Sequence, residues 1–116
     1  MSYFSFLLPV KNAEKTLADT LNSILSQKFQ QFEVLILDNG STDRTYDVIS
    51  TFSDPRIRLL KVHDLSLADA LNLGIQQANG TYCVRIDADD ICYPNRLSYI
   101  SNYLSLNPGI DLFGSF

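Results

Sequence analysis

The chain has 116 residues, enough for one domain with one hydrophobic core and too few for two ordinary domains. Hydrophobic residues make up 46% and charged residues 19%, which is typical of a globular protein rather than a disordered one. The formal net charge of -4 argues against a nucleic-acid partner, because affinity for a phosphate backbone depends on clustered lysine and arginine.

Strand and helix patterns alternate along the whole chain. Short apolar runs rich in strand-forming residues predict strands over 4–9, 32–37, 57–62 and 81–86. Apolar residues at helical spacing predict helices over 14–27, 42–52 and 67–78, and a fourth helix with Pro94 in its first turn. A fifth strand is expected over 110–113.

The ends and buried faces of these helices carry their own signals. Ser41 or Thr42 is the expected N-cap of the second helix, and Ser66 that of the third, where Asp69 completes a pattern resembling a capping box. The predicted apolar stripe of the third helix is Leu67, Leu71, Ile75 and Ala78, and that of the fourth is Leu97, Ile100 and Leu104.

This order of elements predicts an α/β fold, a Rossmann-like three-layer sandwich with a mostly parallel sheet, as one domain over residues 1–116. We expect the first three strands in the order 3-2-1, with the fourth on the other side of the first. Ligands of such sheets bind beyond the carboxyl ends of the strands, where the strand order reverses. The candidate site therefore lies between the first and fourth strands.

Three polar segments are expected to converge at this edge of the sheet. They are Pro9-Val10-Lys11-Asn12 after the first strand, Asp38-Asn39-Gly40 after the second and Asp87-Ala88-Asp89-Asp90 after the fourth. Carboxylates on the same edge of two buried strands repel one another and lose hydration unless they are paired or bound to a cation. Their convergence therefore indicates a functional site.

The segment from Asp87 to Asp90 has two interpretations. Three carboxylates within four residues can present oxygens to one hard cation such as Mg²⁺ or Mn²⁺, which completes its shell with water and phosphate oxygens. Alternatively, the segment is the acidic N-terminus of the following helix, where aspartate interacts favourably with the helix dipole. Arg85, close to the end of the fourth strand, is either an ion-pair partner of this cluster, which we favour, or a direct phosphate contact.

Other catalytic patterns are missing from the sequence. It contains no evident Ser/His/Asp arrangement, no Gly-x-Gly-x-x-Gly and no Gly-x-x-x-x-Gly-Lys loop, which argues against a dinucleotide dehydrogenase or a P-loop enzyme. Cys83 and Cys92 lack metal-type spacing and are expected to be reduced thiols. Without an apolar run of ~18 residues or a signal peptide, the chain is expected in the cytoplasm, or at the inner face of the membrane if a segment outside it attaches there.

Four pieces of the sequence, in order, resemble a family-2 glycosyltransferase from about Phe4 to Ser115. The pieces are Leu7-Leu8-Pro9-Val10-Lys11-Asn12-Ala13-Glu14, Leu37-Asp38-Asn39-Gly40-Ser41-Thr42-Asp43, Ala70-Leu71-Asn72-Leu73-Gly74-Ile75 and Arg85-Ile86-Asp87-Ala88-Asp89-Asp90. The resemblance implies the glycosyltransferase A fold and an enzyme that builds bacterial surface glycans. It would transfer a sugar, with inversion, from a nucleotide-diphosphate donor, usually a UDP-sugar, to a glycan or lipid-linked acceptor.

The resemblance also implies roles for individual residues. Pro9 to Asn12 would line the nucleotide pocket, Asp38 would contact the base edge, and the Asp-x-Asp element would fall on Asp87 and Asp89, the ligands of Mg²⁺ or Mn²⁺. The full implied donor-binding set is Pro9, Val10, Asn12, Asp38, Asn72, Arg85, Asp87 and Ala88. Two residues depart from the family pattern, because Asn39 replaces a second Asp and Leu71 replaces an Arg that many members carry.

By the same resemblance, the acceptor-binding region and the general base lie beyond Phe116. We therefore expect a truncated domain that binds a donor without efficient transfer, and an exposed sheet edge through which two chains could pair as a homodimer. Two other functions compete. A nucleotidyltransferase usually has a glycine-rich loop after the first strand, whereas this chain has Lys11-Asn12-Ala13-Glu14-Lys15. A non-catalytic nucleotide-binding or interaction module on the same fold is the alternative that the departures at Asn39 and Leu71 favour.

Overall fold

Four parallel strands form one sheet in the order β3-β2-β1-β4. They are β1 (Phe4–Val10), β2 (Phe32–Asn39), β3 (Ile57–Val62) and β4 (Tyr82–Arg85). The computed structural model describes residues 3–106, so the strand expected over 110–113 lies outside the described residues. The predicted strand order is confirmed. Within the described part of the chain β3 and β4 are the outer strands, and pairing of two chains through such an edge stays a prediction.

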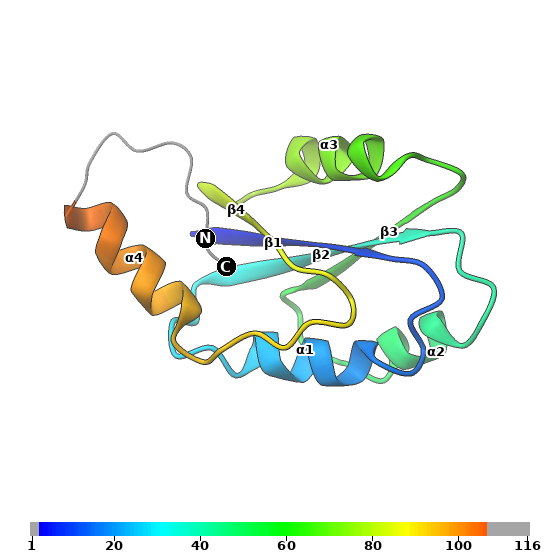
Figure 1. The fold of residues 1–116 in the computed structure, drawn as a ribbon, viewed down its shortest axis with the longest axis horizontal. Helices are drawn as coiled ribbons and strands as arrows, with labels where there is room; N and C mark the ends of the chain where they lie inside the picture. Colours follow the sequence, from blue (N-terminus) through cyan, green and yellow to red (C-terminus); the bar gives the residue numbers. More distant parts are fainter. Residues whose placement is uncertain (1–2, 107–116) are drawn as a thin grey trace.

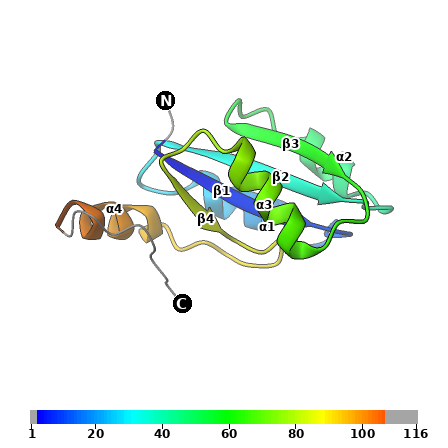
Figure 2. The same cartoon turned by 90° about the horizontal axis from the view of Figure 1, so that it is seen from above.

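Four helices connect or follow the strands. They are α1 (Leu17–Leu25), α2 (Thr45–Ser50), α3 (Leu67–Gln77) and α4 (Arg96–Leu106). Figure 1 shows α3 on one face of the sheet and α1 and α2 on the other, which confirms the three-layer arrangement. Figure 2 shows that α4 projects beyond the sheet, away from the carboxyl ends of the strands. None of the helices within residues 3–106 is both long and apolar enough to cross a membrane.

The main core lies between the sheet and the layer of α1 and α2. Successive residues of a strand point to opposite faces, so alternate residues of β1 and β2 meet these helices. The fully buried members are Phe4, Phe6, Leu8, Val34 and Ile36 of the sheet and Leu17, Leu21 and Ile24 of α1. Leu97, Ile100 and Leu104 of α4 join the same cluster, as predicted from their spacing.

The predicted apolar stripe of α3 is wrong. The fully buried residues of this helix are Ala70 and Gly74, whereas Leu67 and Ile75 are 49% and 55% exposed. The reason is the short distance between α3 and the sheet, since a Cβ on Gly74 would come within 3.0 Å of methyl groups of both Leu7 and Leu37. A leucine stripe does not fit in this space, so the small residues face the sheet, Leu67 and Ile75 are exposed and Leu71 is half-buried.

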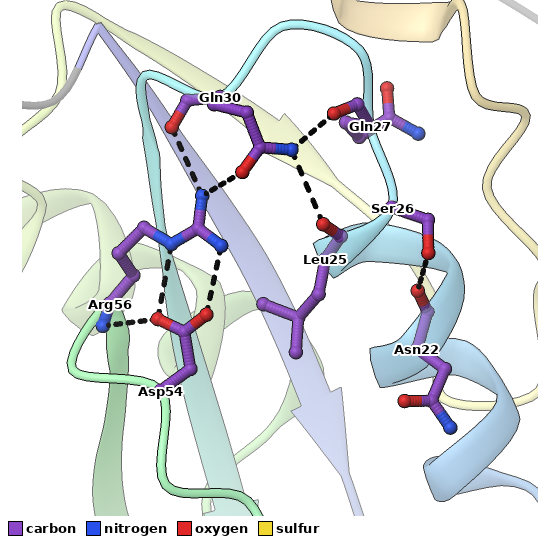
Figure 3. Close-up of polar contacts among 7 residues, drawn as sticks. All are labelled: Asn22, Leu25, Ser26, Gln27, Gln30, Asp54 and Arg56. Carbon is purple, nitrogen blue, oxygen red and sulfur yellow. Dashed lines mark hydrogen bonds and ion pairs between the residues drawn. The ribbon is translucent and has the colours of Figure 1, made fainter.

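Arg56 holds together the amino-terminal edge of the sheet, as Figure 3 shows. Its Nε and Nη2 donate to the two carboxylate oxygens of Asp54 at 3.1 and 2.8 Å. Its Nη1 donates to the backbone carbonyl and side-chain oxygen of Gln30 at 3.1 and 2.8 Å, and its guanidinium lies 4.3 Å from the centre of the Phe32 ring. The arginine thus joins the loop before β2 to the turn before β3.

A buried carboxylate, Glu33 of β2, links β1, β3 and the loop before β4 near the same edge. It accepts hydrogen bonds from Ser5 Oγ and Asn79 N, both at 2.6 Å, and from Arg58 Nη1 at 2.8 Å. Burial raises the pKa of Glu33, but these hydrogen bonds and the Arg58 charge outweigh that effect and hold its pKa below the ordinary value of 4.5. Glu33 therefore stabilises the fold in its ionised form.

This network predicts an acid-dependent contribution to stability. Because the folded-state pKa of Glu33 is lowered, its contribution is fully present above about pH 5 and is lost as the pH falls through the folded-state pKa. Glu33→Gln should lower the free energy of unfolding at pH 7 by about 1–3 kcal/mol, because it removes a charged acceptor from three donors. In denaturation series from pH 7 to pH 3, the gap between wild type and variant should shrink on acidification. A gap of constant size would contradict the assignment.

Candidate functional site

An open cleft of about 360 Å³ lies at the carboxyl ends of β1 and β4, where the strand order reverses. Its lining residues come from the ends of β1, β2 and β4, from the loops after β1 and β4, and from α3. They are Pro9, Val10, Lys11, Asn39, Leu67, Ala70, Arg85, Asp87 and Asp89. The position is the one predicted from the strand order, and the volume falls within the usual range of small-molecule sites.

The turn after β4 brings two carboxylates into the cleft and leaves a third outside its lining. The backbone N–H of Asp90 donates to the Asp87 carbonyl at 3.0 Å, and Asp90 Oδ2 accepts from the Asp87 N–H at 3.3 Å. Asp87 and Asp89 line the cleft. The following helix, α4, begins only at Arg96, so the alternative of an acidic helix N-terminus is wrong for this segment.

Arg85 forms an ion pair with Asp87, as we favoured from the sequence. Its Nε and Nη2 donate to the same oxygen, Asp87 Oδ1, at 3.2 and 3.1 Å. Both side chains are about half-exposed, at 48% and 50%. In an extended segment, residues two apart point to the same side, which explains how these side chains meet.

Hydrogen bonds from Thr16 and Thr20 hold the acidic turn in place. Both hydroxyl groups donate to the carbonyl oxygen of Ala88 at 2.9 Å, and Thr20 is fully buried on α1. Ala88 was predicted to bind the donor, but in the structure its carbonyl anchors the turn and it is not among the residues that line the cleft. The sequence prediction assigned no role to these two threonines, which lie one helical turn apart.

Asn12 links the loop after β1 to the loop after β2. It has a positive φ of 54°, which asparagine tolerates better than most residues. Its N–H donates to Ser41 Oγ at 2.9 Å, and its side-chain oxygen accepts from Thr42 N at 2.8 Å. Ser41 and Thr42 are therefore engaged with Asn12 and do not cap α2, which begins at Thr45 with Arg44 at the N-cap position. The predicted caps are wrong for this reason.

Asp38 and Asn72 do not line the cleft. Asp38 is buried at 6% exposure beside Val10, and its Oδ1 accepts from the N–H of Ser41 at 3.2 Å. Asn72 lies on the exposed part of α3, next to the half-buried Leu71. The cleft thus brings together Pro9, Val10, Arg85, Asp87 and Asp89 of the predicted set. The roles assigned to all the predicted site residues stay predictions.

Asn39 explains why this chain departs from the second Asp of the family pattern. Its side-chain Nδ2 donates to the Leu65 carbonyl at 2.7 Å, and its Oδ1 accepts from the Leu65 N–H at 3.2 Å. An ionised aspartate accepts hydrogen bonds but cannot donate one, so it could not form the first of these. Asn39 holds the loop before α3 at the end of β2, and this loop leads to Leu67 in the cleft wall.

Asn39→Asp should therefore destabilise the protein. A carboxylate would face the Leu65 carbonyl without a proton between them, and we expect a loss of about 1–3 kcal/mol in the free energy of unfolding at pH 7. Asn39→Ala removes both hydrogen bonds without adding a charge. Its stability therefore gives the effect of losing the hydrogen bonds alone, and any further loss in Asn39→Asp measures the repulsion between the carboxylate and the Leu65 carbonyl. Urea denaturation of the three proteins measures both effects. Equal stability of Asn39→Asp and wild type would contradict this account.

The cleft suits a cation that is shared with a phosphorylated ligand. Within residues 3–106, no group of three or more His, Cys, Asp or Glu side chains is arranged to hold a metal ion without help. Mg²⁺ usually takes only one or two protein carboxylates and completes its shell with water and phosphate oxygens. Asp87 and Asp89 match this donor set, and in the described part of the chain Asp87 Oδ2 has no hydrogen-bond partner.

The comparison with known proteins decides the family. The sequence profile described as Glycosyl transferase family 2 matches residues 5–114, nearly the whole chain. The chain belongs to this family. Among its relatives is UDP-Glc:alpha-D-GlcNAc-diphosphoundecaprenol beta-1,3-glucosyltransferase WfgD of Escherichia coli, which is 31% identical over 113 residues, covering 97% of this chain and 45% of that protein.

Solved structures share the fold of this family 2 chain. Staphylococcus aureus TarS 1-349 in complex with UDP-GlcNAc has a TM-score of 0.84 at 22% identity, covering 97% of this chain and 37% of that one. The mannosyltransferase PcManGT from Pyrobaculum calidifontis, in complex with GDP-Man and Mn²⁺, has a TM-score of 0.83 at 23% identity, covering 92% and 33%. The predicted glycosyltransferase A fold is therefore confirmed. The chain spans 36% to 48% of the length of three curated relatives.

Proposed function

We propose that this protein binds a nucleotide-sugar donor, with a preference for UDP-sugars, and transfers the sugar with inversion to a glycan or lipid-linked acceptor. The observation that carries this proposal is the cleft at the strand-order reversal, whose lining joins Asp87 and Asp89 with the segment from Pro9 to Lys11. The names of the relatives support the donor class, because WfgD uses UDP-Glc and the TarS structure contains UDP-GlcNAc.

Each part of the cleft has a task in this proposal. The apolar residues Pro9, Val10 and Leu67 offer a surface for the nucleoside, and Lys11 and Arg85 offer positive charge for the diphosphate. Asp87 and Asp89 would hold Mg²⁺ or Mn²⁺ between themselves and the phosphates. The cation would act as a Lewis acid that offsets the charge developing on the departing nucleoside diphosphate.

The names of two relatives support a proposal for the acceptor and the cellular setting. WfgD acts on a diphosphoundecaprenol-linked sugar, and a Staphylococcus epidermidis relative is named a poly-beta-1,6-N-acetyl-D-glucosamine synthase. We therefore propose synthesis of bacterial surface polysaccharide on the cytoplasmic side of the membrane. Activity on a lipid-linked acceptor, measured by sugar incorporation into the lipid fraction, would test this part.

Donor binding can be tested on the chain itself. UDP and Mn²⁺ together should raise the melting temperature by several degrees, because a ligand that binds only the folded state stabilises it by mass action. UDP alone and Mn²⁺ alone should have much smaller effects, and GDP in place of UDP reports base preference. A folded protein whose melting temperature responds to neither nucleotide in the presence of Mn²⁺ would contradict the proposal.

A further inference from the structure

Three arginine ion pairs occur within residues 3–106, and one differs from the others in its surroundings. Arg56 uses donors on all three nitrogens to join two loops (Figure 3), and Arg58 pairs with the buried carboxylate of Glu33. Arg85, by contrast, pairs with the half-exposed Asp87 inside the cleft. The first two ion pairs hold parts of the fold together, whereas the Arg85 guanidinium uses only two of its five N–H donors in its ion pair.

The geometry of the Arg85–Asp87 pair leaves one group free on each partner. Both donated hydrogen bonds end on Oδ1 of Asp87. In the described part of the chain, neither Oδ2 of Asp87 nor Nη1 of Arg85 has a hydrogen-bond partner. A half-exposed pair of this kind contributes little to stability, since water already solvates both charges and the side chains lose entropy when they are held together.

The backbone of Arg85 is held independently of its side chain. Its strand pairs with β1, where Leu7 lies opposite Arg85, and its carbonyl accepts a hydrogen bond from Arg96 Nη2 at 3.4 Å. Helix α3 packs mainly on β1 and β2, and the Arg85 side chain is 48% exposed. The guanidinium can therefore swing within the cleft while the strand stays in place.

Charge in the cleft changes when a ligand enters. With no ligand present, the two carboxylates that line it face two cations, Lys11 and Arg85. A diphosphate adds negative charge and a divalent cation adds positive charge, so both partners of the ion pair then have a stronger alternative partner. A carboxylate is attracted more strongly to a doubly charged metal cation than to a singly charged guanidinium, and a guanidinium forms strong two-point hydrogen bonds with phosphate.

We propose that Arg85 exchanges partners during donor binding. In the empty cleft it neutralises Asp87 and so weakens the attraction of the site for a free divalent cation. When the nucleoside diphosphate enters with its cation, Asp87 turns to the cation and Arg85 turns to the diphosphate. The exchange makes the site selective for the cation–nucleotide complex over the cation alone, and it supplies the basic contact that Leu71 does not provide. This inference rests on the proposed donor binding.

The exchange predicts opposite effects of one substitution on two affinities. Arg85→Gln should bind Mn²⁺ alone about two- to fivefold more tightly, because Asp87 is no longer neutralised. The same variant should bind UDP at saturating Mn²⁺ at least about tenfold more weakly, because the phosphate contact is lost. Arg85→Lys keeps the charge without the two-point geometry and should fall between wild type and Arg85→Gln in both measurements.

The experiment uses the full chain, free Mn²⁺ measured by electron paramagnetic resonance and UDP binding measured by calorimetry. Lys28→Gln is the matched control, since it removes the same charge from an exposed position at the opposite edge of the sheet. Arg85→Gln with tighter Mn²⁺ binding and unchanged UDP binding would overturn the exchange, as would weaker UDP binding with unchanged Mn²⁺ binding. If the wild-type protein binds neither UDP nor GDP, both the proposed function and the exchange are wrong. If the wild-type protein binds UDP and the Arg85 variants bind Mn²⁺ and UDP with the same affinities as wild type, only the exchange is wrong.

Discussion

Replacing Asp89 with alanine is expected to abolish the rise in melting temperature that UDP and Mn²⁺ cause together. Asp89 lines the cleft and is exposed, so its carboxylate is available to a cation. A site with only two carboxylates cannot lose one without losing most of its affinity for the cation, and the diphosphate then meets the uncompensated charge of Asp87. We expect at least about a hundredfold loss of UDP affinity in the presence of Mn²⁺.

The neighbouring position provides the control. The carboxylate of Asp90 accepts a hydrogen bond from the Asp87 N–H, and Asp90 is not part of the cleft lining. The side-chain oxygen of an asparagine can accept the same hydrogen bond. Asp90→Asn should therefore keep the response to UDP and Mn²⁺. The melting temperature of unliganded Asp89→Ala should stay close to that of wild type, which separates lost binding from lost folding. A full response of Asp89→Ala would remove Asp89 from the metal site.

Replacing Gly80 with alanine should cause the largest loss of stability among the changes considered. A Cβ at this position would lie 2.6 Å from the backbone carbonyl carbon of Phe4 and 2.7 Å from the backbone N of Ser5. These atoms belong to β1, which pairs with both β2 and β4, so they cannot move without disturbing the sheet. We expect the free energy of unfolding to fall by at least about 3 kcal/mol.

Gly74→Ala is the matched comparison, because the added Cβ there meets only the ends of two flexible leucine side chains, Leu7 and Leu37, at 3.0 Å. In a helix interior, alanine is also favoured over glycine by about 1 kcal/mol. The two effects oppose each other, so this variant should stay within about 1 kcal/mol of wild type in urea denaturation. Similar losses for both glycine variants would show that the close approach at Gly80 relaxes easily.

The strands and their order could be predicted from the sequence because each strand is a short run rich in strand-forming residues and alternates with a helix. The limits of β3 agree with the predicted residues 57–62 at both ends. The helix limits could not be predicted, since they depend on contacts between distant loops. Helix α1 begins at Leu17 instead of Glu14 because Ala13 N bonds to Thr45 Oγ1, and Glu14 N to the Asp43 carboxylate.

The acidic part of the site was predictable for the same reason as the sheet. Asp87 and Asp89 come directly after a strand whose place in the sheet is fixed, so their location follows from the strand order. The supporting contacts were not predictable, because their partners are backbone groups. Any residue could supply the carbonyl of Ala88 or the peptide of Leu65, so no sequence pattern reports the bonds that Thr20 and Asn39 make with them.

The close packing of α3 has a consequence for protein engineering. Gly74 sets the height of the helix above the sheet, while Ala70, one turn earlier on the same face, forms part of the cleft wall. A bulkier residue at position 74 would push α3 away from the sheet and tilt it, and the tilt would move Ala70 in the cleft wall. No residue that lines the cleft would have to be changed. The size of ligand that the cleft admits could then be adjusted from the back of the helix.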